Sequence, residues 1–511
     1  MSRTLQFKLG LDEELEEKLQ WLAPQMSEHR ILKQSVDARR RHDAHFVYSV
    51  EIAENGEKLP HEDHTPARLK FIRGDRPLVI GTGPGGLFAA LRLAERGLPC
   101  RILERGSPAE TRIGRINRFW RYGHLDPDDN VCFGEGGAGL YSDGKLITRI
   151  KSPHIPYVLQ KLVEFGAPGM IRYLSNPHVG SDRIRRLLPR LRQRLLDLGC
   201  EIHYKTSFHS LWIEAGRVRG VQTSDGRLFQ GDQVILATGH SAIDVLQNLH
   251  AQGVLLEGKS FALGLRIEHP QMRINQIQYR ENAGHPKLGA ANYRLADHDK
   301  NEDVGVYSFC MCPGGYVLSS GTEPDALVCN GMSNFHRKGA FANAAIVVSI
   351  DHAKSFPGNL WGGLELRRQM EVGAFEAVQR AGGSRELPAQ RVQDFLLERN
   401  SSQDLPSSSP SGVLGVRLDQ LLPTYFSEHL EKSLQNFNRL LPGFISPEAV
   451  FHGIESRTSC PIRIPRNETT LESLSHPGLF PCGEGAGYAG GITSAACDGV
   501  RIAEQVLHTR L

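Results

Sequence analysis

A glycine-rich stretch near residue 80 has the residue types and spacing of a phosphate-binding turn. Its sequence, GTGPGG (residues 81–86), contains the pattern GxGxxG between an apolar run, PLVIG, and a helical pattern, LFAALRLAERG. Here Gly81 permits a tight turn, Gly83 lets a pyrophosphate approach the backbone, and Gly86 lets the helix pack closely on the strand. The start of the helix adds free N–H groups and a positive dipole end. Because strand, turn and helix occur in the required order, the pattern predicts a dinucleotide site.

A carboxylate follows this fingerprint at the distance where a ribose would lie. Glu104 ends a second apolar run, LPCRILE, and Arg105 comes directly after it. A carboxylate in this place can accept hydrogen bonds from both hydroxyls of an adenosine ribose, and it would repel a 2′-phosphate. The position disfavours NADP at this site, but the fingerprint by itself does not separate FAD from NAD.

Three further segments favour FAD. The first, FGEGGAGLYSDGKL (133–146), has enough glycine for the backbone to approach a flat ligand, and Ser142 and Lys145 could reach its polar atoms. A flexible surface loop is the alternative for this segment. The second, VILATGH (234–240), ends an apolar strand in small residues, where open α/β sheets bind nucleotides. The third, LFPCGEGAGYAGGITSAA (479–496), offers Glu484 to the ribityl hydroxyls and the start of a last helix to the flavin N1/C2 edge.

These segments require a parallel sheet built from pieces that lie far apart in the chain. We predict an α/β fold with a discontinuous Rossmann-type FAD-binding domain at residues 76–245 and 445–511. A middle α+β domain at 246–444 would serve as substrate domain or cap. Residues 1–75 are expected to form a small α+β module with the element order β-α-β-β. Within the middle domain, NSSQDLPSSSPSG (400–412) predicts an irregular exposed loop.

The overall composition is that of an ordinary globular chain, and its 511 residues are too many for one simple core. Lys and Arg total 60 against 57 acidic residues, so the net charge of +3 gives no support for nucleic-acid binding. Nine scattered cysteines without a CxxC pair disfavour a disulfide framework. Neither a signal peptide nor an apolar span of ~18 residues is visible, so we expect a cytoplasmic protein. A basic amphipathic helix is expected to turn its arginines to solvent: Arg183, Arg186, Arg190 and Arg194.

The sequence also resembles a known family over nearly its whole length. The matching motifs are SVDAR (35–39), CFGEGGAGLYSDGKL (132–146), ATGHSA (237–242), YSFCMCPGG (307–315), NGMS (330–333), ESRTSCPIRIPR (455–466) and CGEGAGYAGGITSAACDG (482–499). They resemble an uncharacterised family of FAD-dependent, NAD(FAD)-utilising dehydrogenases, and more broadly the FAD-binding fold of the glutathione reductase type. Glu484 departs from related flavoproteins, in which Asp is commoner at this place.

The resemblance implies a set of residues that contact FAD. These are Gly81, Gly83, Gly86, Glu104, Gly136, Gly137, Ser142, Thr238, Gly239, Glu484 and Ile492, with Phe208 beside the adenine. To this set we add neighbours within the same segments: Arg105, Lys145, Gly483 and Gly491.

Candidates for chemistry beside the cofactor are few. His240, in ATGHSA, could act as an acid or a base, although a histidine that merely packs beside the ligand is the commoner case. Arg457, Arg463 and Arg466 could hold an acidic substrate by bidentate contacts. They could equally pair with nearby carboxylates or with the flavin.

Two cysteines and the question of a metal complete the candidates. Cys310 and Cys312 lie two apart in an expected strand, so they would share a face. A disulfide at this spacing is strained, which favours buried packing over a redox pair. No metal site is expected, because no second Cys or His pair lies at ligand spacing.

The leading prediction is an FAD-dependent oxidoreductase, a dehydrogenase or reductase, that transfers hydride at flavin N5 to or from a small substrate not yet known. The alternatives are a non-catalytic binding protein that keeps the FAD fold and an RNA-modifying flavoprotein. A plain NAD dehydrogenase would leave the C-terminal glycine segment without a purpose. NAD(P)H could reduce the flavin, but residues 246–444 contain no second fingerprint, so the electron donor and acceptor stay open.

Overall fold

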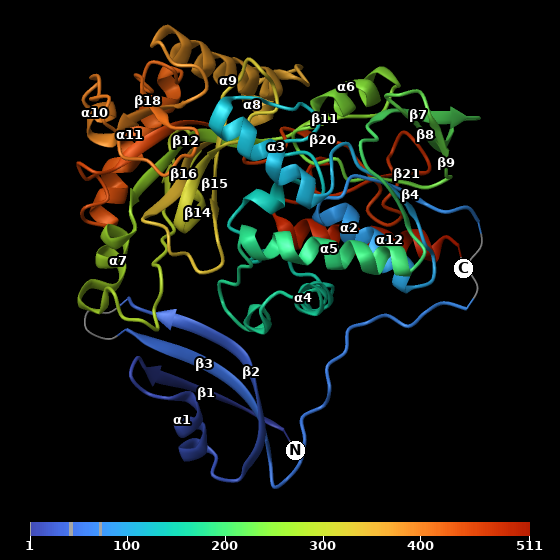
Figure 1. The fold of residues 1–511 in the computed structure, drawn as a ribbon, viewed down its shortest axis with the longest axis horizontal. Helices are drawn as coiled ribbons and strands as arrows, with labels where there is room; N and C mark the ends of the chain where they lie inside the picture. Colours follow the sequence, from blue (N-terminus) through green and yellow to red (C-terminus); the bar gives the residue numbers. More distant parts are fainter. Residues whose placement is uncertain (1, 40–43, 71–73, 511) are drawn as a thin grey trace.

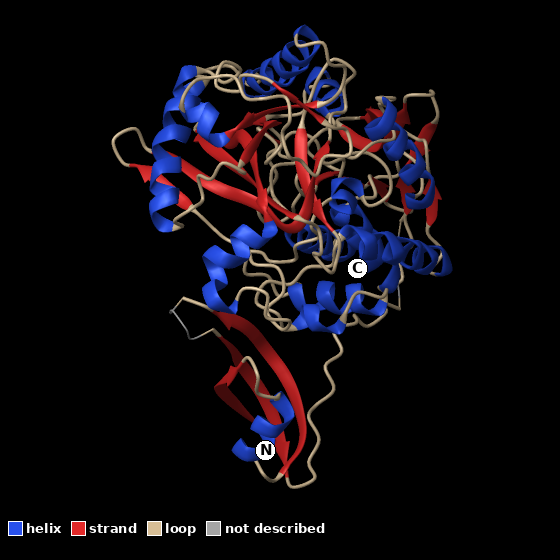
Figure 2. Ribbon diagram, turned by 60° about the vertical axis from the view of Figure 1, so that its left-hand side comes forward, coloured by secondary structure: helices blue, strands red, loops and turns tan. Residues whose placement is uncertain are grey.

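Two large sheets form the body of the protein, and a small module lies at one end of it (Figure 1). The computed structural model describes residues 2–39, 44–70 and 74–510. A second view shows the same separation, with a long irregular segment of chain leading from the module to the body (Figure 2). That segment is attached to the body, since the His64 amide donates to Gln160 Oε1 at 2.8 Å and the Leu69 amide donates to the Arg96 carbonyl.

A five-stranded parallel sheet collects short apolar runs from three separate parts of the chain. Its strands, in spatial order, are β21 (Leu479–Pro481), β10 (Val234–Leu236), β4 (Leu78–Ile80), β5 (Arg101–Leu103) and β6 (Glu201–His203). All four pairings are parallel. The three central strands, β10, β4 and β5, are almost wholly buried, as expected of parallel strands covered on both faces.

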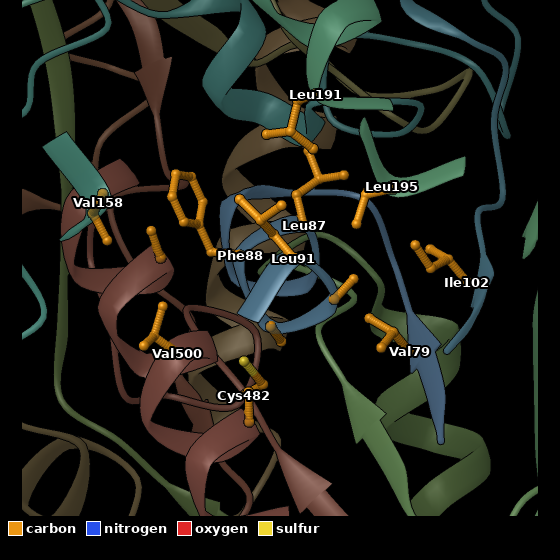
Figure 3. Packing of buried hydrophobic residues seen from close by; sticks show 14 of the residues in the cluster. Val79, Leu87, Phe88, Leu91, Ile102, Val158, Leu191, Leu195, Cys482 and Val500 are labelled. Atoms are coloured by element: carbon orange, nitrogen blue, oxygen red, sulfur yellow. The ribbon is translucent and has the colours of Figure 1, made fainter. Parts of the chain in front are cut away.

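Helices cover this sheet and create its core. The helices are α2 (Pro84–Glu95), α4 (Ile155–Glu164), α5 (Ser181–Asp197) and α12 (Ile492–His508). Figure 3 shows α2 at the centre, where Phe88 and Leu91 lie among side chains of α5, α12 and strand β4. α2 is buried on nearly every side, which explains its almost uninterrupted apolar sequence.

The amphipathic helix α5 turns four leucines inward (Leu187, Leu188, Leu191 and Leu195) and three of its six arginines outward. Arg186, Arg190 and Arg194 are exposed, as predicted. Arg183 differs, because its guanidinium lies 4.2 Å from the centre of the Phe335 ring and is half-buried there. The basic face is therefore mainly a solvated surface with one stacking contact.

The second large sheet is antiparallel apart from one edge pair. In spatial order its strands are β13 (Ala296–Asp299), β14 (Val304–Ser319), β16 (Phe341–Ile350), β12 (Phe261–Pro270), β19 (Val450–Glu455), β17 (Leu387–Arg391) and β18 (Val413–Gly415), with β15 (Cys329–Ser333) beside β14. Helices α9 (Gly362–Arg380) and α11 (Thr424–Leu440) pack on it and share its apolar core.

The expected boundary at residue 445 falls too early. Strand β19 comes after it, yet β19 pairs with β12 and β17 in the antiparallel sheet. Its apolar sequence does suit a buried strand, but the identity of its partners is decided by tertiary packing. The chain returns to the parallel sheet only with β21.

The loop at 400–412 is irregular, as predicted, but it is only partly exposed. The Ser408 amide and hydroxyl both donate to the buried carboxylate of Glu268, and Ser407 Oγ lies 2.9 Å from His452 Nε2. Its serines therefore fasten the loop to the large sheet. The expectation of an exposed loop missed this because hydroxyl groups can satisfy a buried carboxylate as well as face water.

The N-terminal module has the order β-α-β-β that the sequence predicts. Its elements are β1 (Arg3–Gly10), α1 (Leu15–Leu22), β2 (Met26–Asp37) and β3 (His45–Glu54), in an antiparallel sheet with β3 in the middle. The polar connection DARRRHD includes residues 40–43, and the segment EDHTPARLKFIRGDRP includes residues 71–73. Both sets lie outside the described residues.

The module touches both parts of the body. On one side Gln34 exchanges two backbone hydrogen bonds, each of 2.9 Å, with residues 173 and 175. On the other side Lys287 forms an ion pair of 2.8 Å with Glu14, and Leu288 is buried in the core of the module. Residue 174 belongs to the helical layer near α4, whereas Leu288 follows a helix that packs on the antiparallel sheet.

The remaining elements connect these parts. They are α3 (Ala109–Tyr122), η1 (Gly137–Tyr141), η2 (Gly169–Arg172), β7 (Phe208–Glu214), β8 (Arg217–Thr223), β9 (Leu228–Gln230), α6 (Ile243–Ala251), β11 (Glu257–Gly258), α7 (Gln271–Tyr279), η3 (Arg280–Asn282), α8 (His352–Ser355), α10 (Val392–Leu396) and β20 (Ile462–Arg463). All nine cysteines are free. Across residues 2–39, 44–70 and 74–510, no helix is long and apolar enough to cross a membrane.

Two glycines of the fingerprint differ in what surrounds them, and this gives a stability prediction. A Cβ at Gly86 would lie 1.9 Å from the carbonyl oxygen of Gly81 and 3.3 Å from Val79. Because the obstacle is backbone, we expect Gly86→Ala to lower the free energy of unfolding by about 3 kcal/mol in urea denaturation of the ligand-free protein. Gly83→Ala is the matched control, since its Cβ would meet nothing within 4 Å and its φ of −70° suits alanine. A comparable loss in both variants would contradict this assignment.

Candidate functional site

One cavity of about 370 Å³ lies where the carboxyl ends of the parallel strands meet the antiparallel sheet. It brings together nearly all the residues predicted to hold a cofactor: Gly81, Gly83, Glu104, Arg105, Gly137, Ser142, Lys145, Phe208, Thr238, Gly239, Gly483, Glu484, Gly491 and Ile492. Gly86 and Gly136 do not line the cavity. Gly86 is the close-packing position described above, and a Cβ at Gly136 would lie 2.6 Å from the Leu188 side chain of α5.

Several glycines of the cavity wall have open space in place of a side chain. A Cβ on Gly83, Gly239, Gly490 or Gly491 would meet no atom within 4 Å. These four residues come from three separate segments, and all of them line the cavity. Such a cradle lets a ligand approach the backbone, with the N-terminal ends of α2 and α12 adding N–H donors.

The carboxylate of Glu104 holds the glycine segments together. Its Oε2 accepts hydrogen bonds from the amide and the hydroxyl of Thr82, at 2.8 and 2.5 Å. Its Oε1 accepts from the amides of Gly106 and Gly134, at 2.9 and 3.0 Å. Four donors thus already surround the carboxylate that the sequence assigned to the ribose. In the structure Glu104 fixes the shape of the cradle, and it still forms part of the cavity wall.

A buried arginine that the sequence did not single out shapes the neighbouring loop. Arg112, on α3, is fully buried and donates hydrogen bonds to backbone carbonyls of residues 130, 131, 135 and 137, at 2.7 to 2.9 Å. Five donors in a rigid fork suit this task better than any other side chain. Arg112 therefore fixes the first part of the glycine loop, on the N-terminal side of most of the loop residues that line the cavity. Its only signal in the sequence was a charge on the inner face of a helix.

Of the two carboxylates predicted to contact the ligand, Glu104 is fully hydrogen-bonded within the protein, whereas Glu484 is not. Among the described residues, none donates a hydrogen bond to its side chain. Burial raises the pKa of Glu484 to about 7, and the positive charge of Lys259 offsets part of that rise. An acid in this condition gains from donors on a ligand, such as hydroxyl groups.

The opposite wall of the cavity belongs to the antiparallel sheet and to the chain after β19. Its polar residues include Cys310, Asn330, Glu455 and Thr458. The Glu455 carboxylate is paired with Arg266, which is fully buried, through contacts of 2.9 and 3.0 Å. This pair was not among the residues predicted from the sequence. The signal available was a charged residue in each of two largely apolar strand patterns, FALGLRIEH and VFHGIE.

The candidate arginines divide between the cavity and the fold. Arg457 lines the cavity, but its guanidinium is already paired with Glu371 at 3.0 Å and with Glu323 at 2.7 Å. Arg466 lies outside the cavity, paired with Asp498 and stacked 3.7 Å from the Tyr488 ring centre. Arg463 also lies outside, over the same ring. Of the two alternatives, Arg466 takes the local one, because its partner is the Asp498 carboxylate. Neither Arg463 nor Arg466 lines the cavity, so the structure does not bring them to a molecule held there.

The two cysteines of the CxC sequence do not share a face. Strand β14 has a bulge between Phe309 and Cys312, and Cys310 adopts a left-handed φ of 48°. As a result Cys310 lines the cavity while Cys312 is buried, with its thiol donating to the Cys310 carbonyl at 3.2 Å. Regular strand alternation was the wrong assumption here. Lys145 reaches the same bulge, because its ammonium group donates to the Met311 carbonyl.

His240 lies in the turn four residues after β10 and lines the cavity. Burial, with the charges of Arg367 and Arg457, lowers the pKa of His240 to about 3. The ring is therefore neutral at ordinary pH, so it does not supply a readily exchanged proton. Among the described residues, no group of three or more His, Cys, Asp or Glu side chains could hold a metal ion.

A glycine cradle over a parallel sheet, with an unpaired acid and two helix N-termini, defines a dinucleotide-binding flavoprotein. Residues 76–115 match the family model described as an FAD binding domain, and residues 260–458 match that described as FAD-dependent protein, C-terminal domain-like. An uncharacterised protein of Clostridium beijerinckii is 38% identical over 514 residues, which cover 97% of this chain and 95% of the relative. The chain belongs to this FAD-dependent protein family, and FAD is its cofactor.

Solved structures resemble the chain only distantly. A glycine oxidase from Bacillus cereus is 12% identical, with 85% of this chain and 95% of that chain covered and a TM-score of 0.32. An L-proline dehydrogenase from P. horikoshii is 12% identical, with 86% and 95% covered and a TM-score of 0.35. The halogenase PltM is 11% identical, with 85% and 70% covered and a TM-score of 0.39.

The open space at Gly83 gives a binding prediction. An alanine methyl group there would enter the cavity without touching the protein. We expect Gly83→Ala to weaken FAD binding at least about tenfold, which corresponds to the loss of one close contact of about 1.4 kcal/mol. Titration of the FAD-free protein, followed by flavin fluorescence, measures this. Unchanged affinity in a normally folded variant would show that FAD does not approach this turn.

Proposed function

We propose that this protein is an FAD-dependent oxidoreductase that acts on a small molecule in the cavity between its two sheets. The observation that carries the proposal is that one cavity has two different walls. The first is a glycine cradle suited to a dinucleotide, and the second carries polar side chains of the antiparallel sheet. A cofactor needs only the first wall, so the second is free to select a substrate.

The cradle residues would hold the cofactor in the manner of the glutathione reductase type. Support comes from the open glycines, from Phe208 in the wall near the adenine end of the fingerprint, and from the unpaired carboxylate of Glu484. When bound, FAD supplies the redox step, accepting or giving a hydride at its N5. The chain supplies position, a shaped wall and a restricted supply of water.

The antiparallel sheet would act as the substrate wall. Its charged members, Glu455 and Arg457, are each already paired with a buried partner. Each buried pair is fixed by hydrogen bonds, so the wall has a defined shape. The two charges of each pair offset one another, so the wall has little net charge. We therefore expect hydrogen bonding and fit, rather than a strong charge, to select the substrate. Cys310 and Asn330 contribute further polar groups to this wall.

The spectrum of the purified protein tests this function. We expect a yellow protein whose FAD is reduced by a small donor and reoxidised by an acceptor. Anaerobic titrations with NADH and NADPH, followed at the flavin band, ask whether a nicotinamide is that donor. Bleaching by one of them would identify a reductase with a docking surface that carries no second glycine fingerprint. A yellow protein indifferent to both would direct the search to other donors. A protein that cannot be loaded with FAD, or whose FAD is inert to every donor including dithionite, would contradict the oxidoreductase proposal.

The raised pKa of Glu484 gives a pH prediction for FAD binding. If the carboxylate accepts hydroxyl groups of FAD, binding favours the deprotonated form and releases a proton. Affinity should then rise with pH and level off above the pKa of about 7 in the free protein. Between pH 8 and pH 6 we expect a loss of about tenfold. The matched control is Glu484→Gln, whose affinity should be independent of pH in this range. A wild-type profile that is flat, or that falls as pH rises, would contradict this contact.

A further inference from the structure

The surroundings of His240 fix which of its ring nitrogens carries the proton. His240 Nδ1 lies 3.0 Å from Ser241 Oγ. The same hydroxyl oxygen accepts a hydrogen bond of 3.1 Å from Arg457 Nη1. A guanidinium only donates, so Ser241 must be the acceptor in that bond, and its own hydroxyl proton remains to be placed.

Two arrangements of protons are conceivable, and each leaves one donor without an acceptor among the described residues: the Ser241 hydroxyl in the first and Nε2–H in the second. If Nδ1 carried the proton, Ser241 would accept from both neighbours, and its hydroxyl proton would have no acceptor among the described residues. If Nδ1 is bare, Ser241 donates to it and the chain Arg457–Ser241–His240 is complete. Because a hydroxyl that accepts from a charged guanidinium becomes a stronger donor, the second arrangement, in which Ser241 donates to Nδ1, is favoured. The proton of the neutral ring then lies on Nε2.

The arginine at the head of this chain cannot easily move away. Arg457 Nη1 also donates to Thr322 Oγ1 at 2.7 Å, and its Nη2 donates to Glu323 and Glu371 at 2.7 and 3.0 Å. Arg457 is buried, so each of these bonds is shielded from water. The anchor therefore keeps Ser241 oriented, and Ser241 keeps the ring of His240 in one tautomer.

The ring also stays uncharged over the ordinary pH range. Burial opposes a positive ring most strongly, and the charges of Arg367 and Arg457 oppose it too. Glu371 and a hydrogen bond with the backbone of His240 itself favour a positive ring less strongly. His240 lines the cavity, and since Nδ1 is occupied, Nε2 is the nitrogen available to a bound molecule.

We propose that His240 is a fixed, neutral hydrogen-bond donor whose Nε2–H binds a carbonyl-type oxygen of a molecule held in the cavity. This rests on the proposed function, since the oxygen belongs either to the flavin or to a substrate beside it. The role differs from that of an acid or base, because the proton stays on the ring. Ser241 and Arg457 are positioning residues that act through His240.

The Nε2–H donor is tested with variants whose side-chain amide nitrogen lies at different distances from the backbone. The amide nitrogen of Gln reaches about as far as Nε2 of His, whereas that of Asn reaches only about as far as Nδ1. We compare FAD affinity and the visible flavin spectrum for wild type, His240→Gln, His240→Asn and His240→Ala. If the acceptor is the flavin, Asn and Ala weaken binding about tenfold or shift the flavin band, and Gln retains the wild-type behaviour within about threefold.

A second set of titrations distinguishes the substrate as the source of the oxygen. The FAD-loaded proteins are titrated with pyruvate, which presents ketone and carboxylate oxygens, and the flavin band is followed. If the acceptor lies on the substrate, FAD affinity is equal in all four proteins, while pyruvate perturbs only wild type and His240→Gln. Equal behaviour of all four proteins in both titrations would overturn the proposal.

The tautomer of the His240 ring can be determined by NMR, without an activity assay. In ¹⁵N-histidine-labelled protein, nitrogen shifts distinguish a bare ring nitrogen from a protonated one, and the His240 signals are those lost in His240→Gln. We expect bare Nδ1 and protonated Nε2 at pH 7, with a mixture of tautomers in Ser241→Ala. A proton on Nδ1, or a charged ring, would overturn the inference. This measurement works on FAD-free protein too, so its failure is separate from a failure of the oxidoreductase proposal.

Discussion

The four hydrogen bonds to the Glu104 carboxylate are the constraint on which the cofactor region depends. They join the fingerprint turn at Thr82 to the amides of Gly106 and Gly134, which belong to two other loops. A buried carboxylate is costly unless its oxygens are fully bonded, so the three loops and the acid stabilise one another. Arg112 has the complementary role: its buried guanidinium carries a positive charge and donates hydrogen bonds to the carbonyls of the same glycine loop. The shape of the cradle is thereby held by contacts within the protein itself.

The antiparallel sheet contributes a wall built on a different principle. Its charges come in buried pairs, such as Arg266 with Glu455, rather than as free groups. Breaking such a pair by removing one partner leaves an uncompensated charge and typically costs several kcal/mol. The wall can therefore offer defined hydrogen-bonding groups beside a cofactor without attracting a large shell of water. The irregular backbone at Cys310 belongs to the same wall, and it separates Cys310, which lines the cavity, from the buried Cys312.

Local patterns were predictable from the sequence, and long-range partners were not. The turn at Gly81 and Gly83 is specified by neighbours within a few residues, so its order of strand, turn and helix could be read directly. The position of Glu104 was also predicted, but its hydrogen-bond partners come from loops whose approach no local pattern encodes. Strand β19 has an unmistakable strand sequence, yet its sheet was assigned wrongly, because pairing depends on the whole fold.

Charged residues were the other source of error. A charge in a sequence suggests surface or ligand, so Arg466 was left open between a substrate and a nearby carboxylate, and Arg112 was overlooked. In the structure both are buried and serve the fold, Arg466 through Asp498 and Arg112 through backbone carbonyls. The bulge at Cys310 was missed for a related reason, since the period of two assumes that every residue of the strand follows the pleat.

The N-terminal module spans the junction between the two sheets from outside. Gln34 is bonded to residues 173 and 175 of the helical layer, while Glu14 and the module's core hold Lys287 and Leu288 of the other part. Any hinge-like opening of the two parts changes the distance between these attachment points, and must stretch or release one of them. The module therefore ties the two parts together outside the cavity, and each of its attachments adds to the free-energy cost of separating them.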